Sequence, residues 1–147
     1  MGDRVSVSFK QNVKMYNAKE RKEKEYREES PALFHHWGGT TFPKLAFDWF
    51  KSIKKKYSKN GGDPFTRMEP RNLMVQLIAH LRNHADLRYS TLNTSKKESD
   101  WDIDPELICY SIYLGKDGND GDNSDNGHYT IDVDAGKMFD DKGQSIG

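Results

Sequence analysis

The hydrophobic residues of this chain change their spacing at Gly38 and Gly39, and this change limits the possible folds most strongly. Before the glycines, Val5, Val7 and Phe9 alternate with polar residues, which is the two-residue period of a half-buried strand. After the glycines, apolar residues recur every three or four positions, which is the period of an amphipathic helix. The chain therefore has to combine strands and helices in separate blocks.

A second strand is predicted just before the glycines. Residues 32–37 are apolar and aromatic, and Pro31 is compatible with a strand start. We expect this strand to pair antiparallel with the first one. Residues 14–29, between the two strands, mix charges and have almost no apolar stripe, so they are predicted to form an exposed charged arm. Their charge spacing leaves both a short helix and an extended hairpin open.

Two amphipathic helices are predicted after the glycines. The first begins with Thr41 as its N-cap and Pro43 in its first turn, and it runs for about four turns. Its apolar stripe consists of Phe42, Leu45, Ala46, Trp49, Phe50, Ile53 and Tyr57. A capping-box pattern of Thr66 and Glu69, with Pro70 in the first turn, predicts the start of the second helix. Its stripe consists of Leu73, Met74, Leu77, Ile78, Leu81 and Ala85.

Strands return in the last third of the chain. Residues 106–114 and 128–133 are predicted strands, and a short edge strand is predicted near residues 138–139. The Asp-, Gly- and Asn-rich residues 115–127 are predicted to form a solvated hairpin loop. The order β-β-α-α-β-β-β indicates an α+β fold, an antiparallel sheet with two helices packed on one face. Residues 1–147 are predicted to form a single domain.

Charge is distributed unevenly although it sums to zero. Residues 1–60 contain 14 Lys or Arg against 7 Asp or Glu, and residues 100–147 contain 3 against 12. We expect the two parts to fold against each other and neutralise locally, while a partner surface stays an alternative. The single cysteine, Cys109, is expected to be a small core residue. Without a leader or a long apolar run, the chain is expected to be cytoplasmic and to have no membrane partner.

Imidazoles, an indole and a helix start coincide at residues 33–41, where we place the candidate ligand site. Two glycines before a helix can turn backbone N–H groups towards one point, which favours an anion. The predicted ligand-binding residues are His35, His36, Trp37, Gly38, Gly39 and Thr40, with Arg67 and Arg71 as further candidates from the second helix. The architectural alternative has one histidine inside, one outside, Trp37 in the core, and glycines that only make the turn.

Other motifs give weaker signals. His80 and His84 have the spacing of a helical zinc pair but lack the Glu of a metalloprotease helix, so they are only weak metal candidates. A calcium loop starting at Asp122 would need Glu where Val133 stands. The lysines of residues 51–59 form the solvent face of a helix, so nucleic acid is not an expected partner. No cofactor and no catalytic residue are predicted.

A single His-x-Thr motif occurs at His128-Tyr129-Thr130, whereas a two-histidine phosphoesterase needs two such strands. The motif therefore predicts no enzyme by itself.

The segment Phe34-His35-His36-Trp37-Gly38-Gly39 ends a strand with an aromatic-x-His-Trp-x-Gly signature, and a late strand contains Tyr129-Thr130-Ile131. This layout resembles a set of small, mostly uncharacterised proteins of phages, plasmids and prokaryotes, many of which have Asp in place of Gly38. The resemblance covers much of the chain but rests on this short signature. It implies an α+β fold and a mobile-element setting, and it transfers no catalytic residues.

Three functional hypotheses follow. The leading one is a small, non-enzymatic, phage-encoded binding protein that sequesters a nucleotide-like anion or blocks a host defence protein. The second is a metal-dependent phosphodiesterase or nuclease that uses His80, His84 and one further histidine, which could be His35, His36 or His128. The third is a pure protein–protein inhibitor that acts through the charged arm or through the acidic residues 115–127. A homo-oligomer is compatible with all three.

Overall fold

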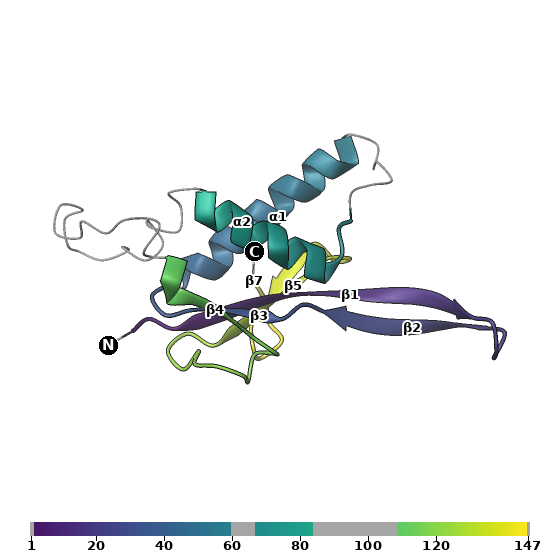
Figure 1. The fold of residues 1–147 in the computed structure, drawn as a ribbon, viewed down its shortest axis with the longest axis horizontal. Helices are drawn as coiled ribbons and strands as arrows, with labels where there is room; N and C mark the ends of the chain where they lie inside the picture. The colour runs from purple at the N-terminus through teal and green to yellow at the C-terminus, as the bar shows by residue number, and fades with distance from the viewer. Residues whose placement is uncertain (1, 60–66, 84–108, 147) are drawn as a thin grey trace.

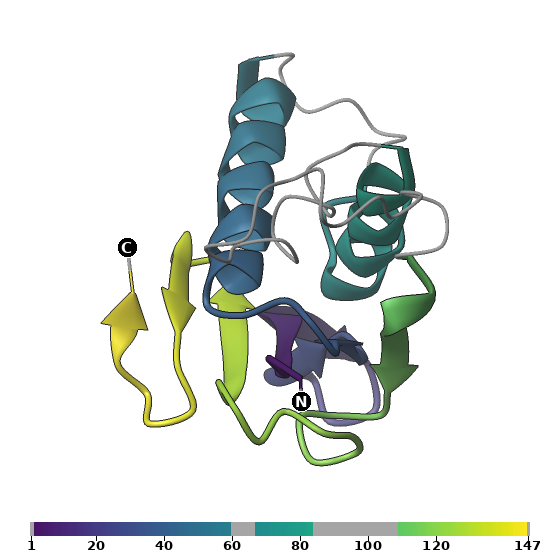
Figure 2. The ribbon, with the colours of Figure 1, turned by 90° about the vertical axis from the view of Figure 1, so that its left-hand side faces the viewer.

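Two helices cover one face of a mixed sheet in the computed structural model, which describes residues 2–59, 67–83 and 109–146 (Figures 1 and 2). The strands are β1 (Val5–Asn17), β2 (Lys22–Glu29), β3 (Ala32–His35), β4 (Ile112–Gly115), β5 (His128–Asp132), β6 (Lys137–Phe139) and β7 (Ser145–Ile146). The helices are α1 (Thr41–Lys59) and α2 (Pro70–Asn83). The predicted α+β class is confirmed. We call the covered side of the sheet the helix face and the other side the open face.

The sheet is mixed, so the prediction of a purely antiparallel sheet was wrong. Its strand order is β4-β3-β1-β5-β6-β7, with β2 also paired to β1. Strand β5 runs parallel to β1, with Ser6 opposite His128 and Lys10 opposite Asp132. We call residues 115–127 the crossing segment. They connect β4 at one side of β3 and β1 to β5 at the other side, so that β5 enters the sheet parallel to β1. They are therefore not the predicted hairpin loop.

The charged residues 14–29 belong to a β-hairpin, one of the two conformations that the sequence left open. Strand β1 continues to Asn17 and pairs with β2 from Lys10–Glu29 to Asn17–Lys22. We call residues 11–28 the arm; it extends away from the helices and the rest of the sheet (Figure 1). The same edge of β1 also pairs antiparallel with β3, as predicted.

The core lies between the helix face and the two helices. Alternate residues of β1 supply Val5, Val7 and Phe9, and β5 supplies Ile131. The helices add the buried side chains Phe42, Ala46, Phe47, Trp49, Phe50, Leu73, Met74, Leu77 and Leu81. Because successive strand residues point to opposite faces, Ser6 and Ser8 of β1 are directed to the open face.

The ends of the predicted elements need correction. Helix α1 has 19 residues and is longer than predicted. Thr41 donates its hydroxyl to the Gly38 carbonyl at 3.1 Å and is itself helical, so it is not the predicted N-cap. Helix α2 begins at Pro70, and the Leu73 N–H donates to the Glu69 carbonyl at 2.9 Å. Thr66 and Ala85 lie outside the described residues.

The strand predicted over residues 106–114 begins only at Ile112. Residues Cys109–Ser111 form a single 3-10 turn, and residues 106–108 lie outside the described part of the chain. The prediction that the Cys109 side chain is buried also falls outside what is described. Among the described helices, none has the length and apolar character to cross a membrane.

Candidate functional site

The strand-to-helix turn places its two histidines differently. His35 is 0% exposed, and its ring packs edge to face against Phe42, with centroids 4.9 Å apart. Its Nδ1 accepts the Trp37 N–H at 3.1 Å, while Nε2 has no hydrogen-bond partner. Burial, and to a lesser extent the nearby His36, lower the pKa of His35 to about 3. His35 is therefore a neutral core residue with no access to a ligand.

The glycines of the turn are already engaged by the N-terminal residues. The Gly39 N–H donates to the Asp3 carbonyl at 2.9 Å, and Gly39 has a positive φ of 60°. A Cβ on Gly39 would lie only 2.7 Å from a carboxylate oxygen of Asp3. An anion at this turn would thus meet a carboxylate and would not find the Gly39 N–H free.

His36 and Trp37 remain at the surface of the turn. Their rings meet at 79° with centroids 4.6 Å apart, and Trp37 is 40% exposed, so it is not the core residue of the architectural alternative. Thr40 is also exposed.

The two arginines lie far from this turn. Arg71 contacts Glu28 at 3.2 Å, and Arg67 contacts Glu69 at 3.4 Å. Glu28 pairs with Gln11, whereas His35 pairs with Val5, six residues earlier in β1. Six strand residues span about 20 Å. The structure therefore does not bring Arg67 and Arg71 to the predicted ligand site.

The predicted metal pair is described only in part. The His80 ring lies 5.9 Å from the Trp49 ring, between centroids, and His84 lies outside the described residues. Within the described ranges, no three His, Cys, Asp or Glu side chains are grouped so that they could hold a metal ion.

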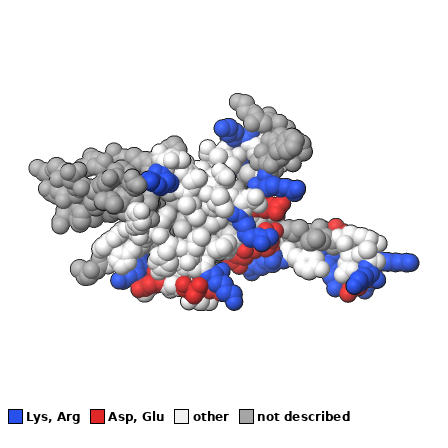
Figure 3. Space-filling view, viewed as in Figure 1, with Lys and Arg blue, Asp and Glu red and all other residues white. Residues whose placement is uncertain are grey.

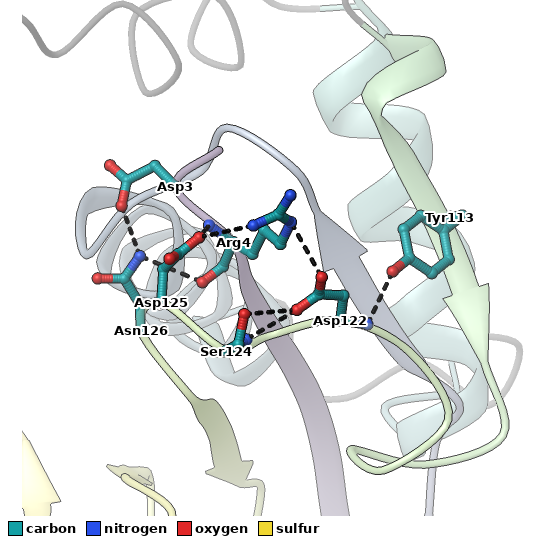
Figure 4. A network of polar contacts seen from close by, with 7 residues as sticks. All are labelled: Asp3, Arg4, Tyr113, Asp122, Ser124, Asp125 and Asn126. Atoms are coloured by element: carbon teal, nitrogen blue, oxygen red, sulfur yellow. Dashed lines mark hydrogen bonds and ion pairs between the residues drawn. The ribbon is translucent and has the colours of Figure 1, made fainter. Parts of the chain in front are cut away.

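The crossing segment is fixed to the start of β1 by a polar network (Figure 4). The Arg4 guanidinium lies 3.1 Å from Asp122 and 3.4 Å from Asp125, and the Arg4 N–H also donates to Asp125 at 2.9 Å. The side chain of Asn126 donates to the Arg4 carbonyl at 3.1 Å. The Asp122 N–H donates to the Tyr113 hydroxyl at 3.0 Å. The segment is therefore a fixed wall of the open face, and most of its residues are exposed to solvent.

This wall borders a hollow of about 670 Å³ on the open face, which we call the His128 hollow. His128 and Thr130 of β5 form part of its lining. The base of the arm contributes Lys10, Arg27 and Glu29, the crossing segment contributes Asp117, Gly118, Asn119 and Asn123, and the chain after β5 contributes Phe139, Asp140, Asp141 and Gly143.

A chain of hydrogen bonds fixes the His128 ring. The Ser8 hydroxyl donates to Glu29 at 3.1 Å, so its oxygen accepts the Nε2–H of His128 at 3.0 Å. Nδ1 of the neutral ring then accepts the Ser6 hydroxyl at 2.7 Å. The Asn123 side chain donates to the Ser6 oxygen at 2.9 Å and joins the crossing segment to this chain.

The surroundings of His128 are acidic. Glu29, Asp141 and Asp117 favour the charged imidazole, but burial outweighs them and lowers the pKa of His128. Four carboxylates line the hollow, those of Glu29, Asp117, Asp140 and Asp141, against the two cations Lys10 and Arg27. Both cations already face carboxylates, Lys10 at 3.8 Å from Asp132 and Arg27 at 3.5 Å from Glu29. The hollow thus has a formal excess of two negative charges.

Sequence reasoning did not find this hollow. The available signal was the His-x-Thr motif in β5 together with the serines that alternate with the apolar residues of β1. The missing information was the parallel pairing that sets Ser6 opposite His128 and Ser8 opposite Thr130.

Comparison of the chain with protein-family models, curated proteins and solved structures finds no match.

Proposed function

We propose that this chain is a non-enzymatic binding protein that holds a small polar ligand with amino groups in the His128 hollow. Glu29, Asp117 and Asp141 come from three separate parts of the chain and line the hollow together with His128, and this arrangement carries the proposal. The fixed wall of the crossing segment supports the proposal. In a preformed hollow, ligand binding loses less entropy because the residues of the site are already ordered.

The charges of the hollow favour a cationic ligand. Its formal excess of two negative charges attracts a protonated amine, and its two cations are already paired with carboxylates. A nucleotide-like anion suits neither this hollow nor the turn at Gly39, where Asp3 lies close by. The proposal therefore moves the ligand site away from His36 and Trp37 and changes the sign of the ligand charge.

The burial of the serines favours binding over catalysis. His128 contacts the hydroxyls of Ser6 and Ser8, but both serines are only 1% exposed. A nucleophile has to contact its substrate, and the burial of these two hydroxyls prevents such contact. The metal-dependent enzyme hypothesis stays a prediction because His84 is not described, and the phage setting and the blocking of a host defence protein also stay predictions.

Titration calorimetry tests the ligand class. We expect saturable heat with spermidine, whose amines are protonated at neutral pH, and tighter binding of glucosamine than of glucose. Asp141→Asn removes one of the converging carboxylates, so it should weaken spermidine binding about three- to tenfold. Asp48→Asn is the matched control, since it removes the same charge from an exposed residue of α1 outside the hollow. Tighter binding of ATP than of spermidine, or equal effects of both variants, would overturn the proposal.

A further inference from the structure

The outer edge of β2 offers backbone groups for pairing. Among the described strands, β2 pairs only with β1, through residues Lys10–Asn17. Its eight residues are exposed or partly exposed along their whole length. An edge strand of this kind presents free N–H and C=O groups to another strand.

The shape of the arm makes this edge accessible. The arm extends beyond the two helices, and its side chains show mixed charges (Figures 1 and 3). A two-stranded ribbon without a covering layer is only marginally stable in water, so an added strand would stabilise it. The contact of Arg71 with Glu28 anchors only its inner end.

We propose that two copies of this chain pair antiparallel through their β2 strands, with Glu25 at the two-fold axis. In this register Lys22 of one copy lies opposite Glu28 of the other, and Glu23 lies opposite Arg27. By symmetry each of these two pairs of opposite charges occurs twice, and each stabilises a cross-strand contact. Lys24 lies opposite Tyr26, which is 45% exposed and can receive the ammonium group over its ring.

The charges of β2 favour this register over registers that are shifted by one or two residues. Its single like-charge contact is Glu25 against its own copy. A shift by two residues in one direction sets Glu23 opposite Glu25, and in the other direction opposite Glu29. A shift by one residue sets Lys22 opposite Arg27, or Glu23 opposite Glu28. Each of these shifts creates at least two like-charge pairs, which are destabilising across strands.

The Glu25 register also joins the two sheets with matching faces. In this register odd-numbered residues lie opposite odd-numbered residues and even-numbered opposite even-numbered, and side chains directly opposite each other point to the same face. The helices of both copies therefore lie on the same side of the joined sheet. Arg27 of β2 lies at the paired edge and also lines the His128 hollow. The association is measured without the proposed ligand, and the proposal does not depend on it.

Sedimentation velocity over about 5 to 500 µM protein tests the association, because a small interface implies weak binding. The wild type should self-associate within this range. Glu23→Arg should weaken the dimer at least about tenfold, and adding Arg27→Glu should restore it to within about threefold of the wild type. Glu25→Thr should strengthen the dimer, since it removes the like-charge contact. Asp48→Arg, the control with the same charge change, should leave it unaltered.

Disulfide trapping tests the register. In a Cys109→Ser background, Glu25→Cys should form a cross-linked dimer on oxidation, because directly opposite Cβ atoms lie about 5 Å apart. Glu23→Cys should not, because its two copies would be offset by about 13 Å along the strands. A monomer at all concentrations, equal effects of Glu23→Arg and Asp48→Arg, or faster cross-linking of Glu23→Cys would overturn the proposal.

Discussion

His35 keeps a neutral imidazole in the core, and this should make stability depend on pH. Its pKa is about 3 in the folded protein against 6.5 for the ordinary group. As the pH falls below 6.5, the unfolded chain takes up this proton first, so folding stability is lost between pH 6.5 and about 3. The expected loss from His35 alone is about 2 kcal/mol between pH 7 and pH 5.

Denaturant unfolding of the wild type and of His35→Asn at pH 7 and pH 5 measures this loss. Asn keeps an acceptor for the Trp37 N–H but cannot titrate, so its stability should fall by about 2 kcal/mol less than that of the wild type. The titration of His128, whose pKa is also lowered, is common to both proteins and cancels in the comparison. Equal losses in the two proteins would show that His35 does not titrate as described.

Individual residues were predictable where a local pattern decides their place. The alternation of β1 identified Val5, Val7 and Phe9 as core residues. The regular spacing around the turn put His35 and His36 on different sides, as the architectural alternative required. The engagement of Gly39 by Asp3 was not predictable, because the two residues are far apart in the sequence and no local pattern links them.

At the scale of elements, the crossing segment should depend on Arg4 for its position. Arg4→Gln removes the ion pairs to Asp122 and Asp125 but keeps the backbone contacts of β1. We expect amide hydrogen exchange at residues 123–127 to become at least about threefold faster. Lys51→Gln is the control, since it removes an ion pair to Asp48 on α1, outside the crossing segment. Unchanged exchange in Arg4→Gln would mean that backbone contacts alone hold the segment.

The helices were predictable from their apolar stripes, whereas the sheet topology was not. A stripe such as Leu73, Leu77 and Leu81 identifies a buried helix face from local spacing alone. The parallel alignment of β5 with β1 depends on where the crossing segment leads the chain, and its polar composition does not specify a direction. The predicted site therefore followed the local motif at residues 33–41, and the His128 hollow, which needs β1, β2 and β5 together, was missed.

At the scale of the whole molecule, the uneven charge of the sequence is partly neutralised by folding. Arg4 pairs with Asp122 and Asp125, and Lys10 pairs with Asp132, so basic residues of the first part contact acidic residues of the last. This supports the expectation that the two parts neutralise each other locally. The acidic excess that remains in the His128 hollow is the basis of the proposed function.

A two-dimensional NMR titration of the full chain with spermidine tests the location and the charge preference of this site most directly. We predict saturable shifts of the backbone amides of Gly118, Asn123, His128 and Gly143, with little change at residues 38–41. The shifts should weaken as salt rises, because the attraction is electrostatic. Saturable shifts at residues 38–41 with ATP, together with none in the hollow with spermidine, would contradict the account and restore the turn at Gly39 as the ligand site.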